Sequence, residues 1–229
     1  LEIVNKNPIQ GDVTAPTINE LRELISGAHA AQNRAVTIGD YKTLVLSMPA
    51  KFGGVKRCSI MQDIDSNLRN INIYVISQST LGYMEPTNTI LKENIKTWLN
   101  TKRLINDSVD ILDAKVVNLE IRFSAIGSNK ESKTETFARI DERMRRYFAE
   151  KLDIGESFSI TDLYSLINGT PGVIDATFVQ VYQKTGAGYA TTKFNVKNNT
   201  TPDGRMIIAP KNVIFEVKYP SKDIKGTLT

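Results

Sequence analysis

Apolar residues recur at helical spacing in some stretches of the chain and alternate with polar residues in others. The helical spacing predicts helices at residues 18–31, 38–48, 88–102, 132–151 and 160–167. The alternation predicts strands at residues 55–62, 69–77, 110–126, 173–183 and 213–218, the first two of which would form a β-hairpin. We therefore expect an α+β fold in which short amphipathic helices pack on antiparallel or mixed sheets.

Two of the expected helices begin at a capping box, in which a Ser or Thr hydroxyl accepts from a backbone N–H three residues later. Thr37 and Asp40 form the first, and Pro49 ends the helix because it cannot continue the hydrogen-bond ladder. Ser159 and Asp162 form the second. In both cases a Pro and Gly corner leads into a strand. The chain thus uses the same capped helix, corner and strand twice.

The alternation is clearest in the strand predicted at 110–126. Its apolar side chains would point to the core, namely Val117, Leu119, Ile121, Phe123 and Ala125. The polar side chains between them would point the other way, namely Asn118, Glu120, Arg122 and Ser124. We expect one face of this strand to be wet.

The order of elements predicts two lobes. Residues 1–17 are polar, contain two prolines and read as an extended linker segment. Residues 18–127 would form a first α+β lobe and residues 128–229 a second, meeting near Ser128. Because the sequence starts at Leu1, we expect it to be a fragment of a longer protein.

Charge leaves a nucleic-acid-associated binding module as an alternative function. The 229 residues contain 29 Lys and Arg against 25 Asp and Glu, for a net charge of +4. Basic and acidic residues are interspersed, whereas nucleic-acid binders usually gather basic residues in a stripe. The basic run at Arg143, Arg145 and Arg146 has acidic neighbours and predicts a self-paired helix face. No apolar run is long enough to span a bilayer, so we expect no direct membrane insertion.

Residues suited to catalysis or metal binding are scarce. His29 and Cys58 are the only residues of their types. We interpret His29 as a solvated helix-end residue and Cys58 as a buried strand residue. Gly186 and Gly188 lack the third glycine and the strand-to-helix context of a dinucleotide site. We expect no catalytic site, metal, cofactor or small-molecule substrate, although an enzyme based on carboxylates remains a third class without specific support.

One stretch carries a family resemblance. The wording Asp40-Tyr-Lys-Thr-Leu-Val-Leu-Ser-Met-Pro-Ala-Lys-Phe-Gly-Gly-Val55 resembles the core region of baseplate J-like proteins, above all the wedge proteins of T-even-type phages. The resemblance continues to about Val181. It is carried there by the polar-faced strand 116–126, the helix ending at Phe148, and the corner Pro171-Gly-Val173.

The resemblance implies a structural component of a contractile phage tail baseplate, without enzymatic activity. Members of this kind form homodimers, bind other baseplate wedge proteins and link neighbouring wedges into a ring around the hub. The ring relays conformational change towards sheath contraction. On this basis we expect a virion protein of the tail baseplate, assembled in the host cytoplasm. Residues Lys184–Gly204 depart from the family pattern, and we interpret them as an insertion that contacts a specific neighbour.

Interface positions do not follow from the resemblance, so we place them by hypothesis. The helix 19–31 and the corner 48–54 would lie at a subunit contact, because the corner puts small and apolar groups on an exposed reversal. The candidate interface residues are Leu21, Leu24, Pro49, Phe52 and Gly53. On this hypothesis, Phe52→Asp weakens dimerisation and leaves thermal unfolding nearly unchanged.

Overall fold

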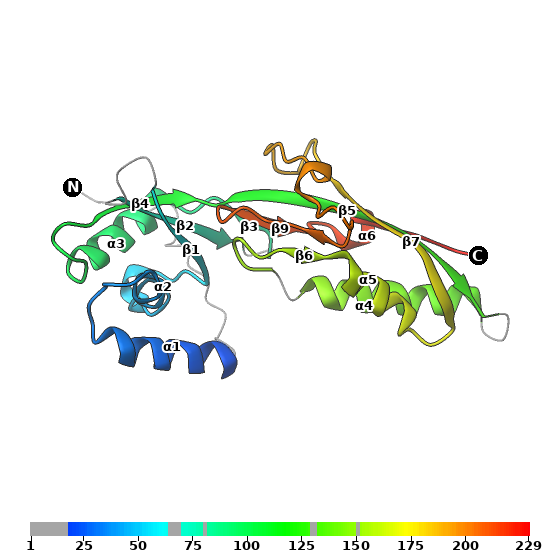
Figure 1. The fold of residues 1–229 in the computed structure, drawn as a ribbon, viewed down its shortest axis with the longest axis horizontal. Coiled ribbons are helices and arrows are strands. Elements are labelled where there is room, and N and C mark those ends of the chain that lie inside the picture. Colours follow the sequence, from blue (N-terminus) through cyan, green and yellow to red (C-terminus); the bar gives the residue numbers. More distant parts are fainter. Residues whose placement is uncertain (1–17, 64–69, 80–81, 129–131, 150–151) are drawn as a thin grey trace, which may run out of the picture. The chain divides into compact units, whose positions relative to one another are not determined.

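The computed structural model describes residues 18–63, 70–79, 82–128, 132–149 and 152–229 (Figure 1). The linker expected at 1–17 lies outside the described residues. The chain divides into two compact units, the first ending at Ala114 and the second beginning at Lys115. The division therefore falls before the boundary expected near Ser128. The α+β class is confirmed.

In its described residues, unit 1 contains three α-helices, a short 3-10 helix and one four-stranded mixed sheet. The helices are α1 (Ile18–Ala31), α2 (Ile38–Leu46), η1 (Ala50–Phe52) and α3 (Thr89–Asn100). The strands are β1 (Arg57–Gln62), β2 (Asn70–Gln78), β3 (Met84–Glu85) and β4 (Ser108–Asp113). Strand β2 pairs antiparallel with β1 and β3, and parallel with β4. The predicted hairpin of β1 and β2 is confirmed.

Side-chain caps fix where the helices of unit 1 begin. The Thr37 hydroxyl accepts from the Asp40 N–H at 3.2 Å, and the Asp40 carboxylate accepts from the Thr37 N–H at 2.8 Å. The predicted capping box is thus complete, and α2 starts at Ile38. Asn88 caps α3 by accepting from the Ile90 N–H at 3.1 Å. The helical spacing of apolar residues predicts that Ile90 points inward, but Ile90 is 46% exposed, so this prediction is wrong.

The core of unit 1 lies between its sheet and the two helices α2 and α3. The helices contribute Tyr41, Leu44, Val45, Leu91, Ile95 and Leu99, and the sheet contributes Cys58, Ile60, Ile71, Ile73, Val75 and Val109. Full burial of each Leu, Ile or Val stabilises the fold by roughly 1.5 to 3 kcal/mol. Helix α1 packs on α2 and forms the outermost layer of the unit (Figure 1).

Unit 2 is built on the long strand β5 (Lys115–Gly127). Its helices are α4 (Lys133–Ala149), α5 (Ile160–Asn168), η2 (Lys197–Asn199) and α6 (Pro220–Asp223). Its other strands are β6 (Phe158–Ser159), β7 (Val173–Gln183), β8 (Met206–Ile207), β9 (Val213–Glu216) and β10 (Ile224–Leu228). Strand β5 pairs antiparallel with β7 and parallel with β9 and β10, while β6 pairs with β8.

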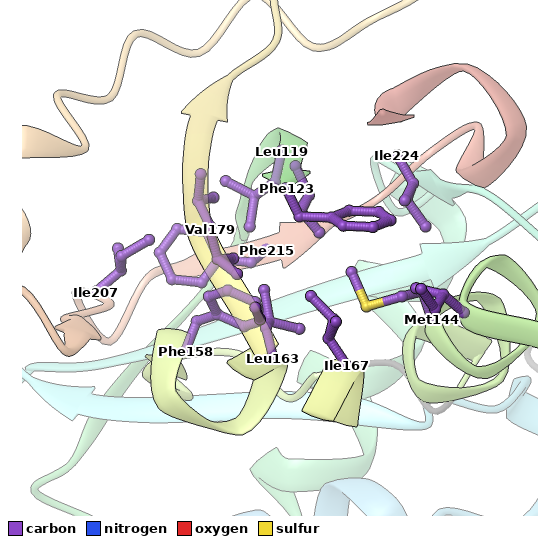
Figure 2. Packing of buried hydrophobic residues seen from close by; sticks show 14 of the residues in the cluster. Leu119, Phe123, Met144, Phe158, Leu163, Ile167, Val179, Ile207, Phe215 and Ile224 are labelled. Carbon is purple, nitrogen blue, oxygen red and sulfur yellow. The ribbon is translucent and has the colours of Figure 1, made fainter. Parts of the chain in front are cut away.

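Helices α4 and α5 cover one face of the β5 sheet and enclose the second core (Figure 2). Met144 comes from α4 and Leu163 and Ile167 come from α5, and all three are fully buried. They meet Phe123 of β5 and Val179 of β7 from the sheet side (Figure 2). The Ser159 hydroxyl accepts from the Asp162 N–H at 3.2 Å and so begins α5 as predicted.

The strand predicted at 110–126 is in fact two strands. Strand β4 ends at Asp113 and belongs to the sheet of unit 1, whereas β5 starts at Lys115 and belongs to unit 2. The Ala114 N–H donates to Val75 O and the Lys115 N–H donates to Asn212 O. The chain therefore changes sheets between these two residues. This exchange of partners moves the lobe boundary from its expected position.

Two further expectations for unit 2 need correction. The strand predicted at 213–218 is not the last one, because it ends at Glu216, Pro220 occupies the first turn of α6 and the unpredicted strand β10 follows. The outer face of β5 is not uniformly wet, because Asn118 and Glu120 are 1% and 3% exposed. Both residues are held there by polar contacts with segments that follow β7.

Candidate interaction site

Helix α1 packs on α2 through a narrow side. Ala31 is buried, and a β-carbon at position 27 would lie 2.4 Å from Thr43 Oγ1. Gly27 therefore allows a close approach that a larger residue would prevent. Leu24, about one turn before Gly27, is half-buried.

The adjacent side of α1 carries apolar residues that remain exposed. Ile18 is 71% exposed, Leu21 42% and Ile25 69%, and Ala28 is exposed as well. Their spacing of three, four and three residues places them on one face of the helix. We call these four residues the α1 strip. Single exposed apolar residues are ordinary, but a continuous row of them is a candidate interaction surface.

The corner after α2 packs against α3 instead of projecting into solvent. Phe52 is half-buried, with its ring centroid 5.9 Å from that of Trp98. Its backbone carbonyl accepts from Asn94 Nδ2 at 3.0 Å. Gly53 is buried, with φ 99°, a conformation that favours glycine. The premise of an exposed corner is therefore wrong for these two residues.

The five candidate interface residues thus have different surroundings. Leu21 lies in the α1 strip, whereas Leu24, Pro49 and Phe52 are half-buried and Gly53 is buried. The five candidates do not include Ile18, Ile25 and Ala28 of the strip, although the hypothesis placed the helix 19–31 as a whole at a contact. Helical spacing places these residues on the apolar side of α1. Only the packing of Gly27 on α2 shows that the side with the α1 strip faces away from the unit.

A buried carboxylate on the outer face of β5 forms the main ion-pair cluster of unit 2. Glu120 lies 2.7 Å from Arg122, 2.5 Å from Lys184 and 3.2 Å from Lys225. Burial raises the pKa of Glu120, but hydrogen bonds from the three cations outweigh this effect and lower the pKa to about 2. The carboxylate is therefore ionised and fully satisfied, which is typical of a structural ion pair.

Tyr189 supports the same region from the segment after β7. Its hydroxyl donates to Asp223 Oδ1 at 2.6 Å, and Asp223 also accepts from the Tyr219 N–H at 2.9 Å. Burial, together with the hydrogen bond to Asp223, raises the pKa of Tyr189 to about 12. The segment after β7 is thus fixed to the turn that precedes β10.

The arginine run on α4 is paired within the unit. Arg145 lies 2.8 Å from Asp141, and Arg146 lies 3.0 Å from Glu142. Arg143 donates to the carbonyl oxygen of Gly169. The predicted self-paired face is confirmed.

The remaining candidates for chemistry occupy ordinary structural positions. His29 is exposed in the last turn of α1, and Cys58 is buried, with its thiol 3.9 Å from Lys42 O. Gly186 and Gly188 follow β7 in an exposed turn with positive φ. Within the described residues, no group of three or more His, Cys, Asp or Glu side chains could hold a metal ion. In the same part of the chain, no helix has the length and apolar character needed to cross a membrane.

The fold has a counterpart among solved structures. It is similar to that of a chain in the cryo-EM structure of the anti-feeding prophage (AFP) baseplate, 6-fold symmetrised. The TM-score is 0.54 at 11% sequence identity, so the likeness concerns the fold. The match covers 88% of this chain and 41% of that chain. This chain therefore spans less than half the length of its structural neighbour. No family model and no curated protein matches the sequence.

The α1 strip is of a kind found at subunit contacts. Multisubunit assemblies bury apolar helix faces of this kind between neighbours. The strip is also distinct from the core of its unit, because α2 and α3 close that core without it. Its exposure therefore does not reflect a poorly packed interior.

Proposed function

We propose that this chain is a structural component of a contractile-tail baseplate and that the α1 strip is one of its subunit contacts. The observation that carries the proposal is the strip itself, a row of exposed apolar residues on the outermost helix of unit 1. The fold likeness to a chain of the AFP baseplate supports the kind of assembly. The resemblance of residues 40–55 to baseplate J-like wedge proteins supports the same assignment.

In finer detail, the chain forms homodimers, binds other wedge proteins and helps link wedges into a ring around the hub. The two separate cores support this role, because each unit can hold a different neighbour without unfolding the other. The packing of α1 on α2 supports a relay of conformational change towards sheath contraction. A helix held on α2 by a narrow side can be repositioned when its other side changes partner.

The polar chemistry supports a structural role over an enzymatic one. A catalytic carboxyl needs a pKa near the working pH, whereas that of Glu120 is lowered to about 2. Its three cationic partners are satisfied by the same carboxylate. The arginines of α4 are likewise paired, which weighs against a phosphate-binding site on this helix.

Charge substitution in the α1 strip tests the proposal. We expect the wild-type chain to self-associate with rising concentration in sedimentation velocity experiments. Ile25→Asp should weaken this association about tenfold or more, because it places a carboxylate in an apolar contact. The matched control is Ala30→Asp, at an exposed position on the other side of the same helix. Thermal unfolding of the monomer should be similar for both variants, since both side chains are exposed.

The outcomes separate the alternatives. A chain that stays monomeric at all concentrations would overturn the proposal that it forms homodimers. Equal association of Ile25→Asp and wild type would overturn the role of the strip. Salt-dependent binding of duplex DNA by the wild-type chain would favour the nucleic-acid alternative instead.

A further inference from the structure

Strand β7 has one paired edge and one edge that is only partly covered. In the sheet order β10, β5, β7 it is the terminal strand, and β5 is its only partner among the described strands. An open edge exposes backbone N–H and C=O groups that can pair with another strand. What covers the second edge therefore decides whether β7 can accept one.

Helix α5 covers the first part of this edge with side-chain acceptors. Asn168 Oδ1 accepts from the Ala176 N–H at 2.7 Å, and the Tyr164 hydroxyl accepts from the Val179 N–H at 3.0 Å. These two amides therefore point away from β5. The coverage ends at Val179.

The alternation of an antiparallel strand then places the backbone groups of Val181 and Gln183 on the same outer edge. The register agrees, because the Lys184 N–H donates to Asn118 O and so points towards β5. Val181 and Gln183 are opposite Ile121 and Leu119 at the positions between such pairs. Within the described residues, no backbone or side-chain group outside the sheet is hydrogen-bonded to the Val181 backbone.

This open part of the edge lies in a groove. The groove has a volume of about 1090 Å³ and is lined on one side by residues 179–183 and on the other by residues 193–197, 200–202 and 204. Five consecutive residues of a strand span roughly 15 Å, enough to pair with a short extended peptide. The groove is therefore a channel beside a strand edge.

The far wall is held in place by contacts with the β7 side chain of Gln183, with the core and within itself. Gln183 Oε1 accepts from the Phe194 N–H at 2.9 Å. Gln183 also donates from Nε2 to Thr192 O, so its side chain bridges this end of the groove. The Phe194 ring packs edge-on against the Phe215 ring, with the ring centroids 5.4 Å apart. Further along, the Thr200 hydroxyl donates to Val196 O at 2.6 Å. The groove is thus formed before any partner arrives, which lowers the entropic cost of binding.

The charge of the lining specifies the partner. Lys193 and Lys197 are the only lysines in the lining, which contains no arginine, Asp or Glu. Both are exposed. A second copy of β7 would bring these lysines against their own counterparts, which is unfavourable. An acidic segment would instead be attracted.

We propose that β7 accepts an added strand at residues 179–183 from a partner protein. The occupant is an extended segment that alternates apolar residues with Asp or Glu. Its backbone pairs with Val181 and Gln183, and its acidic side chains lie near Lys193 and Lys197. Main-chain hydrogen bonds supply affinity in such strand addition, and side-chain contacts supply specificity. This site is in unit 2 and does not depend on the α1 strip or on the baseplate assignment.

The experiment is a selection of peptides from a displayed random-sequence library on the purified chain. We expect the selected peptides to alternate apolar and acidic residues and to slow hydrogen exchange at the Val181 and Gln183 amides. The double variant Lys193→Glu, Lys197→Glu should bind them about tenfold more weakly. The matched control is Lys133→Glu, Lys211→Glu, two exposed lysines of the same unit that do not line the groove. Methylation of alternate peptide amides should abolish binding in one register and spare it in the other.

Several results would overturn the proposal. Recovery of no binding peptide would do so, as would peptides that bind without protecting the two amides. Equal binding by the Lys193→Glu, Lys197→Glu variant and the control variant would exclude a role for these two lysines in recognition of the peptide. Protection of Val181 that rises with protein concentration, without peptide, would assign the edge to a second copy of the chain.

Discussion

The ring of Phe52 lies against the ring of Trp98, with centroids 5.9 Å apart and planes inclined by 42°. Trp98 in turn donates from Nε1 to Leu44 O at 2.9 Å. The two contacts connect the corner after α2 to α3 and to α2 itself. Phe52 is thus part of the packing of unit 1, although sequence reasoning placed it at a subunit contact.

Phe52→Asp should therefore destabilise unit 1 directly. The variant loses an aromatic pair and puts a carboxylate into a half-buried site, at a cost of about 2 to 3 kcal/mol. Urea unfolding monitored by Trp98 fluorescence measures this loss. Ile105→Asp is the control, because Ile105 is 96% exposed and its replacement should leave the midpoint nearly unchanged. A normal midpoint for Phe52→Asp would restore the view of Phe52 as a surface contact.

Local signals in the sequence predicted the helices well. The Thr37 and Ser159 caps, the Pro49 stop and the alternation of β7 depend on residues close together in the chain, so they can be read in one dimension. The same is true of the apolar residues of β5 that form the second core. These features fixed the fold class and most element positions.

Features that depend on distant residues could not be predicted in this way. The break between β4 and β5 occurs inside one continuous alternating stretch, because Ala114 and Lys115 donate to different sheets. Strand β10 contains Gly226, where an added β-carbon would meet the Phe123 ring at 2.1 Å. Glycine is needed there for packing, but in a sequence it reads as a turn signal.

The candidate site shows the same limit. Spacing placed Leu21 and Leu24 on one apolar side of α1, but packing on α2 divides that side into a half-buried and an exposed part. The alternation of β5 predicted that Glu120 is solvated. In the structure Lys184 and Lys225, which are distant in the chain, form ion pairs with it. Neither the burial of the α1 side chains nor the ion pairs of Glu120 can be predicted from local periodicity.

The lowered pKa of Glu120 predicts a loss of stability in acid. The carboxyl has an ordinary pKa of 4.5 and a folded-state pKa of about 2. Because the folded-state value is the lower one, its contribution is fully present above about pH 4.5 and disappears as pH falls towards 2. We expect Glu120 to contribute about 2 kcal/mol to the free energy of unfolding at neutral pH. Solvent and salt screen part of the interaction, because Arg122 and Lys225 are half exposed.

Urea unfolding of wild type and Glu120→Gln at several pH values measures this contribution. The difference in unfolding free energy between the two proteins should be largest near pH 7 and should shrink between pH 4.5 and pH 2. Glu135→Gln is the control, because the Glu135 side chain belongs to the same unit and is 71% exposed. A Glu120→Gln deficit that is constant over this range would mean that packing, and not charge, holds the residue.

The two capping residues allow each unit to be perturbed separately. Thr37→Ala removes the acceptor for the Asp40 N–H, and Ser159→Ala removes the acceptor for the Asp162 N–H. Each should cost about 1 kcal/mol and speed local amide exchange about fivefold. Hydrogen exchange read by mass spectrometry should show the first effect in residues 38–46 and the second in residues 160–168. Thr37→Ser and Ser159→Thr, which keep a hydroxyl, should restore most of the protection. Equal acceleration in both units by either Ala variant would show that the two cores open as one cooperative structure.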